Sequence, residues 1–330
     1  MKIINWGIIG CGDVTEVKSG PAFQKIPGSQ LHAVMRRNAS KAKDYARRHS
    51  VPKWYHDADK LINDPDVDIV YIATPPDSHC EYTFKVAAAG KPVYVEKPMA
   101  RNHRECLDMI QACEQAKIPL FTAYYRRSLP AFTKIKDLLK QQQIGEVRFV
   151  NILLCQPPYE KDYDAKHLPW RVIPEIAGGG YFIDLASHTL DLLDYFFGPA
   201  VEASGLACNQ GRLYPAEDTV TANIRFQTGI IASGVWCFCA SKQKDLVTII
   251  GSEGQISFST FLERDVILEN KNGRSSWPFI KPEHIQQPHI QSIVNQLNGD
   301  GRCPSDGYSA ARTNWVMDQI LAEWRKGGRA

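Results

Sequence analysis

Residues 3–15 read IINWGIIGCGDVT, an apolar run that leads directly into a glycine-rich turn. A continuous apolar run is typical of a strand buried on both faces, as in a parallel sheet. The turn has the pattern Gly-x-Gly-x-x-Thr, in which Gly10 permits a tight turn and Gly12 lets the backbone approach a pyrophosphate. We therefore expect a strand, a phosphate-binding turn that includes Asp13 and Val14, and a helix whose N–H groups point at the phosphate.

Strand and helix patterns continue to alternate as far as residue 124. This alternation is typical of a doubly wound parallel sheet of the Rossmann type. We predict an α/β domain over residues 1–124 that binds a dinucleotide. Its further strands are expected at 30–35, 67–73, 93–95 and 119–124, and its helices at 40–49, 79–89 and 103–116.

The residues after the second strand bear on the choice of cofactor. An NAD-binding fold usually places Asp or Glu about 20 residues beyond the glycines, where it holds the ribose 2′-hydroxyl. This chain has Arg36 and Arg37 there, and guanidinium groups suit a 2′-phosphate. NADP(H) is therefore favoured over NAD(H). The alternative is that two arginines at a strand end face water.

Other candidate residues follow the later strands, at the edge where open α/β sheets hold their ligands. Thr74 and Pro75 begin an extended turn, where we expect the cofactor ribose and phosphates to pass. His79 begins the next helix and is a candidate contact, although a solvent-facing histidine is the more common case. Glu96 and Lys97 end a short apolar strand just before a proline.

From residue 147 the pattern changes to strands that follow one another. Thr228-Gly229 and Asn272-Gly273 are turn signals of the hairpin type. We predict an α+β domain over residues 125–330 with a large, open, mainly antiparallel sheet. Because open sheet faces of this size often form subunit interfaces, a homodimer or homotetramer is expected.

A glycine run, residues 178–180, leads into the helix with the most polar chemistry, and it should let a bulky ligand approach the start of that helix. Asp184, His188 and Asp191 are spaced i, i+4 and i+7, so on an α-helix they share one face. A carboxylate one turn from a histidine can fix its tautomer and raise its basicity, as a general base needs. A metal site would need a further ligand, so no metal is expected. The remaining alternative is a polar stripe that faces solvent.

The chain contains four motifs in this order: the turn at 10–15, the triplet Glu96-Lys97-Pro98, the pair Trp170-Arg171, and the Gly-Gly-Gly-x-x-x-Asp-x-x-x-His-x-x-Asp pattern of 178–191. Together they resemble the glucose-fructose oxidoreductase / inositol dehydrogenase / MocA (Gfo/Idh/MocA) oxidoreductases, over nearly the whole chain. Within that family the sequence looks closest to members similar to 1,5-anhydrofructose reductase and dihydrodiol dehydrogenase. Thr15 stands where Ala is usual and Ala186 where Gly is common, and neither change removes a reacting group.

The resemblance implies hydride transfer between a nicotinamide and a carbinol or carbonyl carbon of a sugar, inositol or related polyol. It implies that Lys97 and His188 lie at the reacting carbon with Asp184 beside them, and that Lys97–Pro98 is a cis peptide. Whether Lys97 or His188 is the ultimate acid or base stays open. The candidates for the rim of the nicotinamide and substrate site are Trp170, Arg171, Tyr125 and Arg126.

The composition argues against several other classes of protein. A net charge of +3 is too small to indicate a nucleic-acid or membrane partner, and the apolar runs are too short to span a bilayer. Nine scattered cysteines without a CxxC pattern suggest reduced thiols in a cytoplasmic protein.

A non-catalytic sensor of dinucleotides or sugars remains the alternative, although the joint presence of Lys97 and His188 favours an enzyme. Reduction of a linear tetrapyrrole suits the polar helix face less well.

Overall fold

The computed structural model describes residues 2–327, and its packing divides the chain into two compact units. The first unit contains Met1–Ala100, Arg104–Leu129 and Pro282–Ala311, and the second contains Arg101–His103, Pro130–Lys281 and Arg312–Ala330. A late segment of the chain therefore returns to the first unit, which no pattern along the sequence indicated. The division into a cofactor domain, 1–124, and a substrate domain, 125–330, concerns function and stays a prediction.

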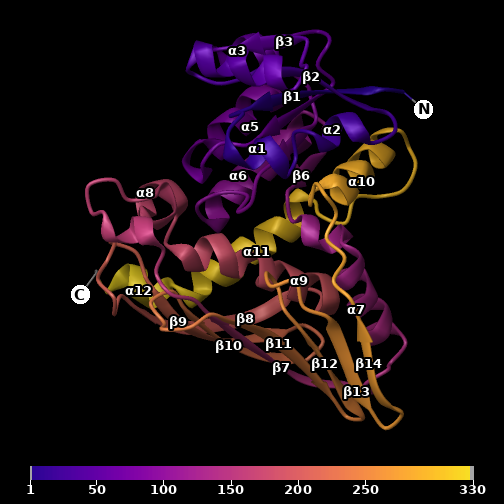
Figure 1. Ribbon diagram of the computed structural model, residues 1–330, viewed down its shortest axis with the longest axis vertical. Coiled ribbons are helices and arrows are strands. Elements are labelled where there is room, and N and C mark those ends of the chain that lie inside the picture. Colours follow the sequence, from indigo (N-terminus) through magenta and orange to yellow (C-terminus); the bar gives the residue numbers. More distant parts are fainter. Residues whose placement is uncertain (1, 328–330) are drawn as a thin grey trace. The chain divides into compact units, whose positions relative to one another are not determined.

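A parallel sheet of six strands forms the centre of the first unit, in the order β3-β2-β1-β4-β5-β6 (Figure 1). Every neighbouring pair is parallel, which confirms the doubly wound sheet. The order reverses between β1 and β4, and open α/β sheets bind ligands at the carboxyl ends of strands at such a point. The strands are β1 (Ile4–Ile9), β2 (Ser29–Met35), β3 (Lys53–Tyr55), β4 (Ile69–Ile72), β5 (Val93–Val95) and β6 (Leu120–Thr122).

Each face of this sheet packs against its own cluster of buried hydrophobic side chains. In β1, Trp6 and Ile8 belong to one cluster and Ile9 to the other, as the alternation of side chains along a strand requires. Ile290 and Ile293 of the returning segment join the cluster that contains Trp6. The helices are α1 (Asp13–Val17), α2 (Ala22–Lys25), α3 (Ala39–Arg48), α4 (Ala58–Ile62), α5 (His79–Ala88), α6 (His103–Gln115) and α10 (Gln287–Leu297).

The second unit is built on an eight-stranded sheet in the order β14-β13-β12-β11-β7-β10-β9-β8. Only β7 and β10 pair in parallel, so the predicted mainly antiparallel sheet is confirmed. The strands are β7 (Val147–Cys155), β8 (Ala200–Cys208), β9 (Thr219–Phe226), β10 (Ile231–Cys237), β11 (Lys244–Gly251), β12 (Gly254–Phe258), β13 (Val266–Asn270) and β14 (Gly273–Trp277).

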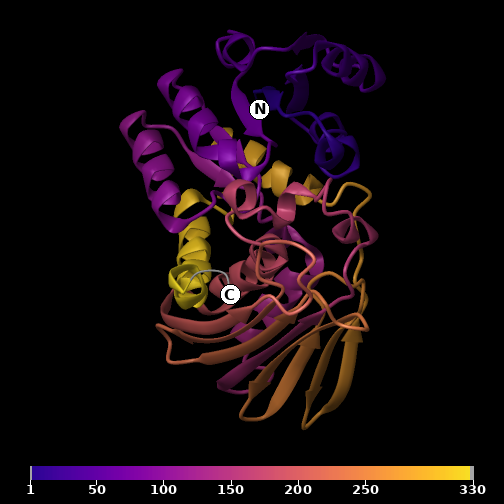
Figure 2. The ribbon, with the colours of Figure 1, turned by 90° about the vertical axis from the view of Figure 1, so that its left-hand side faces the viewer.

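Helices lie over one face of this sheet, and in the described part of the chain the other face has no helix over it (Figures 1 and 2). Aromatic pairs join helices to the covered face, with ring centroids 5.2 Å apart for Phe182–Trp236 and 5.5 Å for Phe197–Phe226. The helices are α7 (Pro130–Lys140), α8 (Pro174–Ala177), a π-helical turn (Phe182–Ala186), α9 (Ser187–Phe197), α11 (Gly307–Ile320), which starts in the first unit, and α12 (Ala322–Lys326). Among residues 2–327 no helix combines the length and the hydropathy that crossing a membrane needs.

Candidate functional site

The two glycines of the first turn have different physical reasons to be glycine. Gly10 has φ +90°, and a Cβ there would lie 2.8 Å from Cγ2 of Thr74. Gly12 has φ −140°, which any residue adopts, and a Cβ there would meet only the Gly10 carbonyl oxygen, at 3.8 Å. The protein itself therefore does not require a glycine at position 12. The open space at its Cα, followed by Asp13 and Val14 at the start of α1, fits the pyrophosphate of a dinucleotide.

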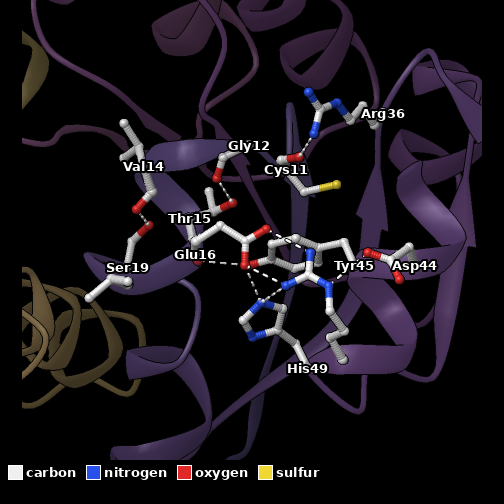
Figure 3. A network of polar contacts seen from close by, with 12 residues as sticks. Cys11, Gly12, Val14, Thr15, Glu16, Ser19, Arg36, Asp44, Tyr45 and His49 are labelled. Carbon is white, nitrogen blue, oxygen red and sulfur yellow. Dashed lines mark hydrogen bonds and ion pairs between the residues drawn. The ribbon is translucent and has the colours of Figure 1, made fainter.

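The helix after the turn is only five residues long, and side chains hold it in place. Thr15 is fully buried and its Oγ1 donates a hydrogen bond to the Gly12 carbonyl at 2.8 Å. The Tyr45 hydroxyl donates to the Thr15 carbonyl at 2.7 Å (Figure 3). Glu16 accepts hydrogen bonds from Arg48 of α3, which lower the pKa of its carboxyl to about 2. Thr15 thus fits its position and contributes a hydrogen bond that the usual Ala lacks.

The two predicted arginines differ in their position relative to the glycine turn, and only Arg36 lies beside it. Arg36 Nη1 donates to the carbonyl oxygen of Cys11 at 3.3 Å (Figure 3). Arg37 is exposed. The structure therefore brings the first of the two predicted arginines to the turn and leaves the second in solvent.

His79 is buried, and the prediction that it faces solvent is wrong. Its Nε2 lies 2.8 Å from the Thr74 carbonyl oxygen, and its Nδ1 lies 3.2 Å from those of both Pro98 and Met99. Burial lowers the pKa of His79. The His79 ring therefore connects the turn at Thr74 and Pro75 with the turn that follows Lys97. The sequence gives no sign of this burial, because it does not show that two turns converge on this side chain.

Lys97 follows β5, and its peptide bond to Pro98 is cis, as expected. Glu96 is 7% exposed, and its Oε2 accepts from the Lys97 backbone N–H at 3.1 Å. Its Oε1 accepts from the Tyr71 hydroxyl at 2.5 Å and from Nε2 of Gln286 at 2.7 Å. Sequence reasoning missed both partners. Tyr71 offered a signal, because a tyrosine inside a fully apolar strand needs a partner for its hydroxyl.

Tyr125 and Arg126 form a buried pair after β6, each 6% exposed. Arg126 Nη1 donates to the Tyr125 hydroxyl at 3.0 Å, and its guanidinium lies 5.1 Å from the centre of the tyrosine ring. The pair belongs to the first unit, as Lys97 does. It stays a candidate for the rim of the site.

The helix predicted after the glycine run is not a regular α-helix. Phe182–Ala186 is π-helical, and α9 begins only at Ser187. The i, i+4 spacing therefore no longer places Asp184 and His188 on one α-helical face, which corrects the prediction. His188 and Asp191 are 4% and 1% exposed, so they are not a stripe that faces solvent.

Asp184 pairs with Arg171, Oδ2 to Nε at 3.1 Å, and the Arg171 guanidinium lies 4.4 Å from the centre of the Trp170 ring. The structure thus joins two of the predicted motifs within the second unit. His188 packs edge-on against Phe261, with ring centroids 5.7 Å apart. Lys97 belongs to the first unit, so the predicted catalytic residues come from both.

The loop that carries Phe261 is held by Asp245, a residue that sequence reasoning missed. Asp245 is 2% exposed, and its carboxylate accepts from the backbone N–H groups of Thr260, Phe261 and Leu262 at 3.1, 2.6 and 3.0 Å. Thr260 also contacts Thr189, next to His188, through their hydroxyls at 2.9 Å. The surroundings of His188 are therefore fixed by a buried carboxylate.

The glycine run packs against protein, not against open space. A Cβ on Gly178 would overlap the Arg101 backbone, and one on Gly180 would lie 2.6 Å from the Glu217 carbonyl oxygen. The Glu217 side chain is buried and accepts from the Gly180 N–H at 2.8 Å. Burial raises the pKa of Glu217 to about 7. The run thus serves close packing at the start of the helix, in place of the approach of a ligand that we inferred from the three glycines.

One group of side chains among residues 2–327 is close enough to share a metal ion, namely His32, Asp64 and Asp66. Lys53 Nζ already lies 3.1 Å from Asp64 and 2.8 Å from Asp66. The carboxylates there are therefore paired with an ammonium group. Asp184 is not a member of this group.

Comparison with known proteins gives a match to two family models along the chain. Residues 4–124 match the model of an oxidoreductase family with an NAD-binding Rossmann fold, and residues 132–257 match the GFO/IDH/MocA C-terminal domain. Oxidoreductase P35 of Formosa agariphila is 41% identical over 316 residues, 96% of this chain and 97% of that protein. The 1,5-anhydro-D-fructose reductase of Ensifer adhaerens is 26% identical over 92% of this chain and 90% of its own length.

A solved structure shares the fold over nearly the full length. The aldose-aldose oxidoreductase of Caulobacter crescentus, complexed with glycerol, superposes with a TM-score of 0.86 at 23% identity, over 99% of this chain and 98% of that chain. Both family models match in the expected order, and a relative at 41% identity spans almost all of the sequence. This chain, which contains a six-stranded sheet of the Rossmann type and a second sheet of eight strands, belongs to the GFO/IDH/MocA family of oxidoreductases.

Proposed function

We propose that this protein is an NADP(H)-dependent oxidoreductase for CH–OH groups. Its substrate is a sugar, a sugar derivative, an inositol or a related polyol. The observation that carries the proposal is the placement of Lys97. This cation follows a buried strand at the ligand-binding edge of the parallel sheet, and the carboxylate of Glu96 binds its backbone N–H. The similarity to 1,5-anhydro-D-fructose reductase supports a polyhydroxylated substrate.

In this proposal the bound nicotinamide supplies or accepts the hydride. Lys97 donates a hydrogen bond to the reacting oxygen of the substrate and polarises the carbon–oxygen bond. His188 exchanges a proton with the same oxygen, which makes the pair an acid–base relay. Asp184, paired with Arg171, orients a substrate hydroxyl or His188. Trp170, stacked on Arg171, then forms part of the rim.

The preference for NADP(H) rests on the arginines after β2. Arg36 reaches the carbonyl oxygen of Cys11 in the glycine turn, so its guanidinium is near enough to the turn to bind a 2′-phosphate. Arg37 is exposed and adds positive charge. A cytoplasmic location is also part of the proposal, supported by nine free cysteines.

The test is a substrate survey in both directions, followed by the absorbance of the reduced nicotinamide. NADPH is offered with keto-sugars, and NADP⁺ with sugars and inositols. We expect turnover with at least one polyhydroxylated compound in each direction. Cofactor binding without turnover across the panel would favour the second candidate, a sensor on the same fold.

A further inference from the structure

Four polar side chains form a network inside the hydrophobic core of the first unit. Tyr71 of β4 and Tyr94 of β5 are in register, and their rings stack with centroids 4.6 Å apart. Glu96 immediately follows β5, and Gln286 immediately precedes α10. Tyr71 and Tyr94 are fully buried, and Gln286 is 1% exposed. The residues are separated by up to 215 positions in sequence and meet only through folding.

The amide of Gln286 has a single orientation that satisfies its neighbours. Its Nε2 donates to Glu96 Oε1 at 2.7 Å, and its Oε1 accepts from the Tyr94 hydroxyl at 2.8 Å. The Glu96 carboxylate also receives the Tyr71 hydroxyl and the Lys97 N–H. Burial, followed by the charge of Glu96, raises the pKa of Tyr71, which keeps its hydroxyl protonated as a donor. Three donors from three segments therefore fix the carboxylate that binds the Lys97 backbone.

The segment that supplies Gln286 also touches the helix after the dinucleotide turn. His284 Nδ1 donates to the Val17 carbonyl at 2.7 Å, and the Gln286 N–H donates to the Lys18 carbonyl at 3.2 Å. Val17 is the last residue of α1. Residues 284–286 thus bridge the end of this helix and the strand end that bears Lys97.

We propose that Gln286 is a positioning residue, which sets Lys97 for reaction by orienting the Glu96 carboxylate. The inference rests on the proposed role of Lys97. If Gln286 only stabilised the core, its replacement would lower stability without changing how turnover depends on pH. If it positions Lys97, a titratable carboxylate placed at position 286 must alter turnover when that carboxylate loses its proton.

The decisive variant is Gln286→Glu. It sets a second carboxylate at the 2.7 Å contact with Glu96, and two carboxylates at this distance share a proton. While the proton is held, the network stays closed and kcat stays near that of the wild type. When the pair loses its proton at higher pH, the carboxylates repel, Glu96 moves, and kcat falls about tenfold or more. Tyr71 and Tyr94 donate hydrogen bonds to the pair, and His79 interacts electrostatically with Glu96. The titratable groups around Tyr94 are Tyr125, His289 and Cys303, and Lys97 adjoins Glu96 in the chain.

The experiment compares the pH dependence of kcat for the wild type, Gln286→Glu, Gln286→Leu and Gln291→Glu. Gln291 lies on the same α10 but contacts Asn295, so it controls for the added charge. We expect a new loss of kcat with rising pH in Gln286→Glu only. Gln286→Leu should lower kcat about tenfold at all pH values, with little change in the Kd for NADPH. Lys97→Met is measured in parallel.

The outcomes separate the two proposals. A Gln286→Glu profile that matches the wild type, with Lys97→Met inactive, overturns the positioning role and leaves the proposed function intact. Near-normal turnover of Lys97→Met overturns the proposed catalytic role itself. If Gln286→Leu does not fold, the test still holds, because the kcat of Gln286→Glu at high pH is compared with the kcat of the same variant at low pH.

Discussion

The backbone around Lys97 is fixed by hydrogen bonds to neighbouring side chains. Glu96 binds its N–H at 3.1 Å, and His79 contacts the carbonyl oxygen of Pro98, the next residue. A group whose backbone is fixed needs less ordering to reach a reacting atom. Substitution of Lys97 should therefore affect turnover and leave the glycine turn, with its separate contacts to Thr15 and Arg36, unchanged.

In the proposed mechanism, Lys97→Met should lower kcat about a hundredfold or more, because removal of one member of a positioned acid–base relay has effects of this size. The Kd for NADPH, measured by fluorescence titration, should change little. Lys60→Met is a matched control, since Lys60 is an exposed lysine on α4. Equal loss of activity in both variants would contradict the assignment.

Arg36→Ser should weaken NADP⁺ binding about tenfold while it changes NAD⁺ binding little, because hydrogen bonds to a charged group contribute about 1.5–3 kcal/mol. Arg104→Ser serves as the control, since Arg104 is exposed on α6. Direct titration of both cofactors measures the effect. Tighter binding of NAD⁺ than of NADP⁺ by the wild type would refute the role of Arg36.

The helical segment from Phe182 to Phe197 shows how packing changes an element whose pattern is clear. Its apolar residues have an α-helical period, yet its first turn is π-helical, and Phe182 packs on Trp236 there. The same turn is anchored by Gly180, whose N–H binds the buried Glu217. A carboxyl in this environment links the stability of the element to pH.

Glu217→Gln should remove part of the pH dependence of stability. The pKa of Glu217 is raised to about 7 from an ordinary value of 4.5, so the folded state keeps its proton where the unfolded state has lost it. The stability that this group contributes is present below pH 4.5 and is lost as the pH rises to about 7. Above pH 7 the variant should therefore be more stable than the wild type, by up to about 3 kcal/mol.

Urea unfolding at about pH 5.5 and about pH 8.5 measures this difference. The Gln oxygen can still accept from the Gly180 N–H, so the hydrogen bond is kept. Glu160→Gln is the control, since Glu160 is exposed. If Glu160→Gln is also more stable than the wild type at the higher pH, the added stability of Glu217→Gln does not come from the loss of the buried carboxyl.

One face of the second sheet exposes several large apolar side chains. On β7, β8, β10 and β11 the register brings Phe149, Leu206, Ile231, Val235 and Leu246 to one face, where they are 38–77% exposed. Contiguous exposed apolar patches usually mark interaction sites. This surface supports the proposal of a homodimer or homotetramer.

Leu206→Glu should convert the proposed oligomer to smaller species, because a carboxylate buried in an apolar interface without a partner costs several kcal/mol. Sedimentation equilibrium measures the mass. Ile280→Glu provides the control, since Ile280 is 67% exposed in a segment between β14 and α10. An unchanged mass for Leu206→Glu would exclude this face as the interface.

Most of the first sheet could be predicted because its strands and helices have strong local periods. The expected strand at 93–95 matches β5, and the helix at 103–116 ends one residue from the observed α6. β3 and β14 were missed. β3 has three residues, none of them buried, and β14 is mostly exposed, so neither carries a hydrophobic pattern.

The local order of the residues thus determines the alternation of strands and helices, the glycine turn and the position of Lys97 after a buried strand. These features depend on neighbours in sequence, whose periodicity and turn chemistry are readable directly. Tertiary structure alone decides that His79 is buried, that Glu217 is desolvated, and that Gln286 completes the site of Glu96. The reason is physical: burial and hydrogen bonding are set by groups that folding brings together from distant segments, and no local pattern records them.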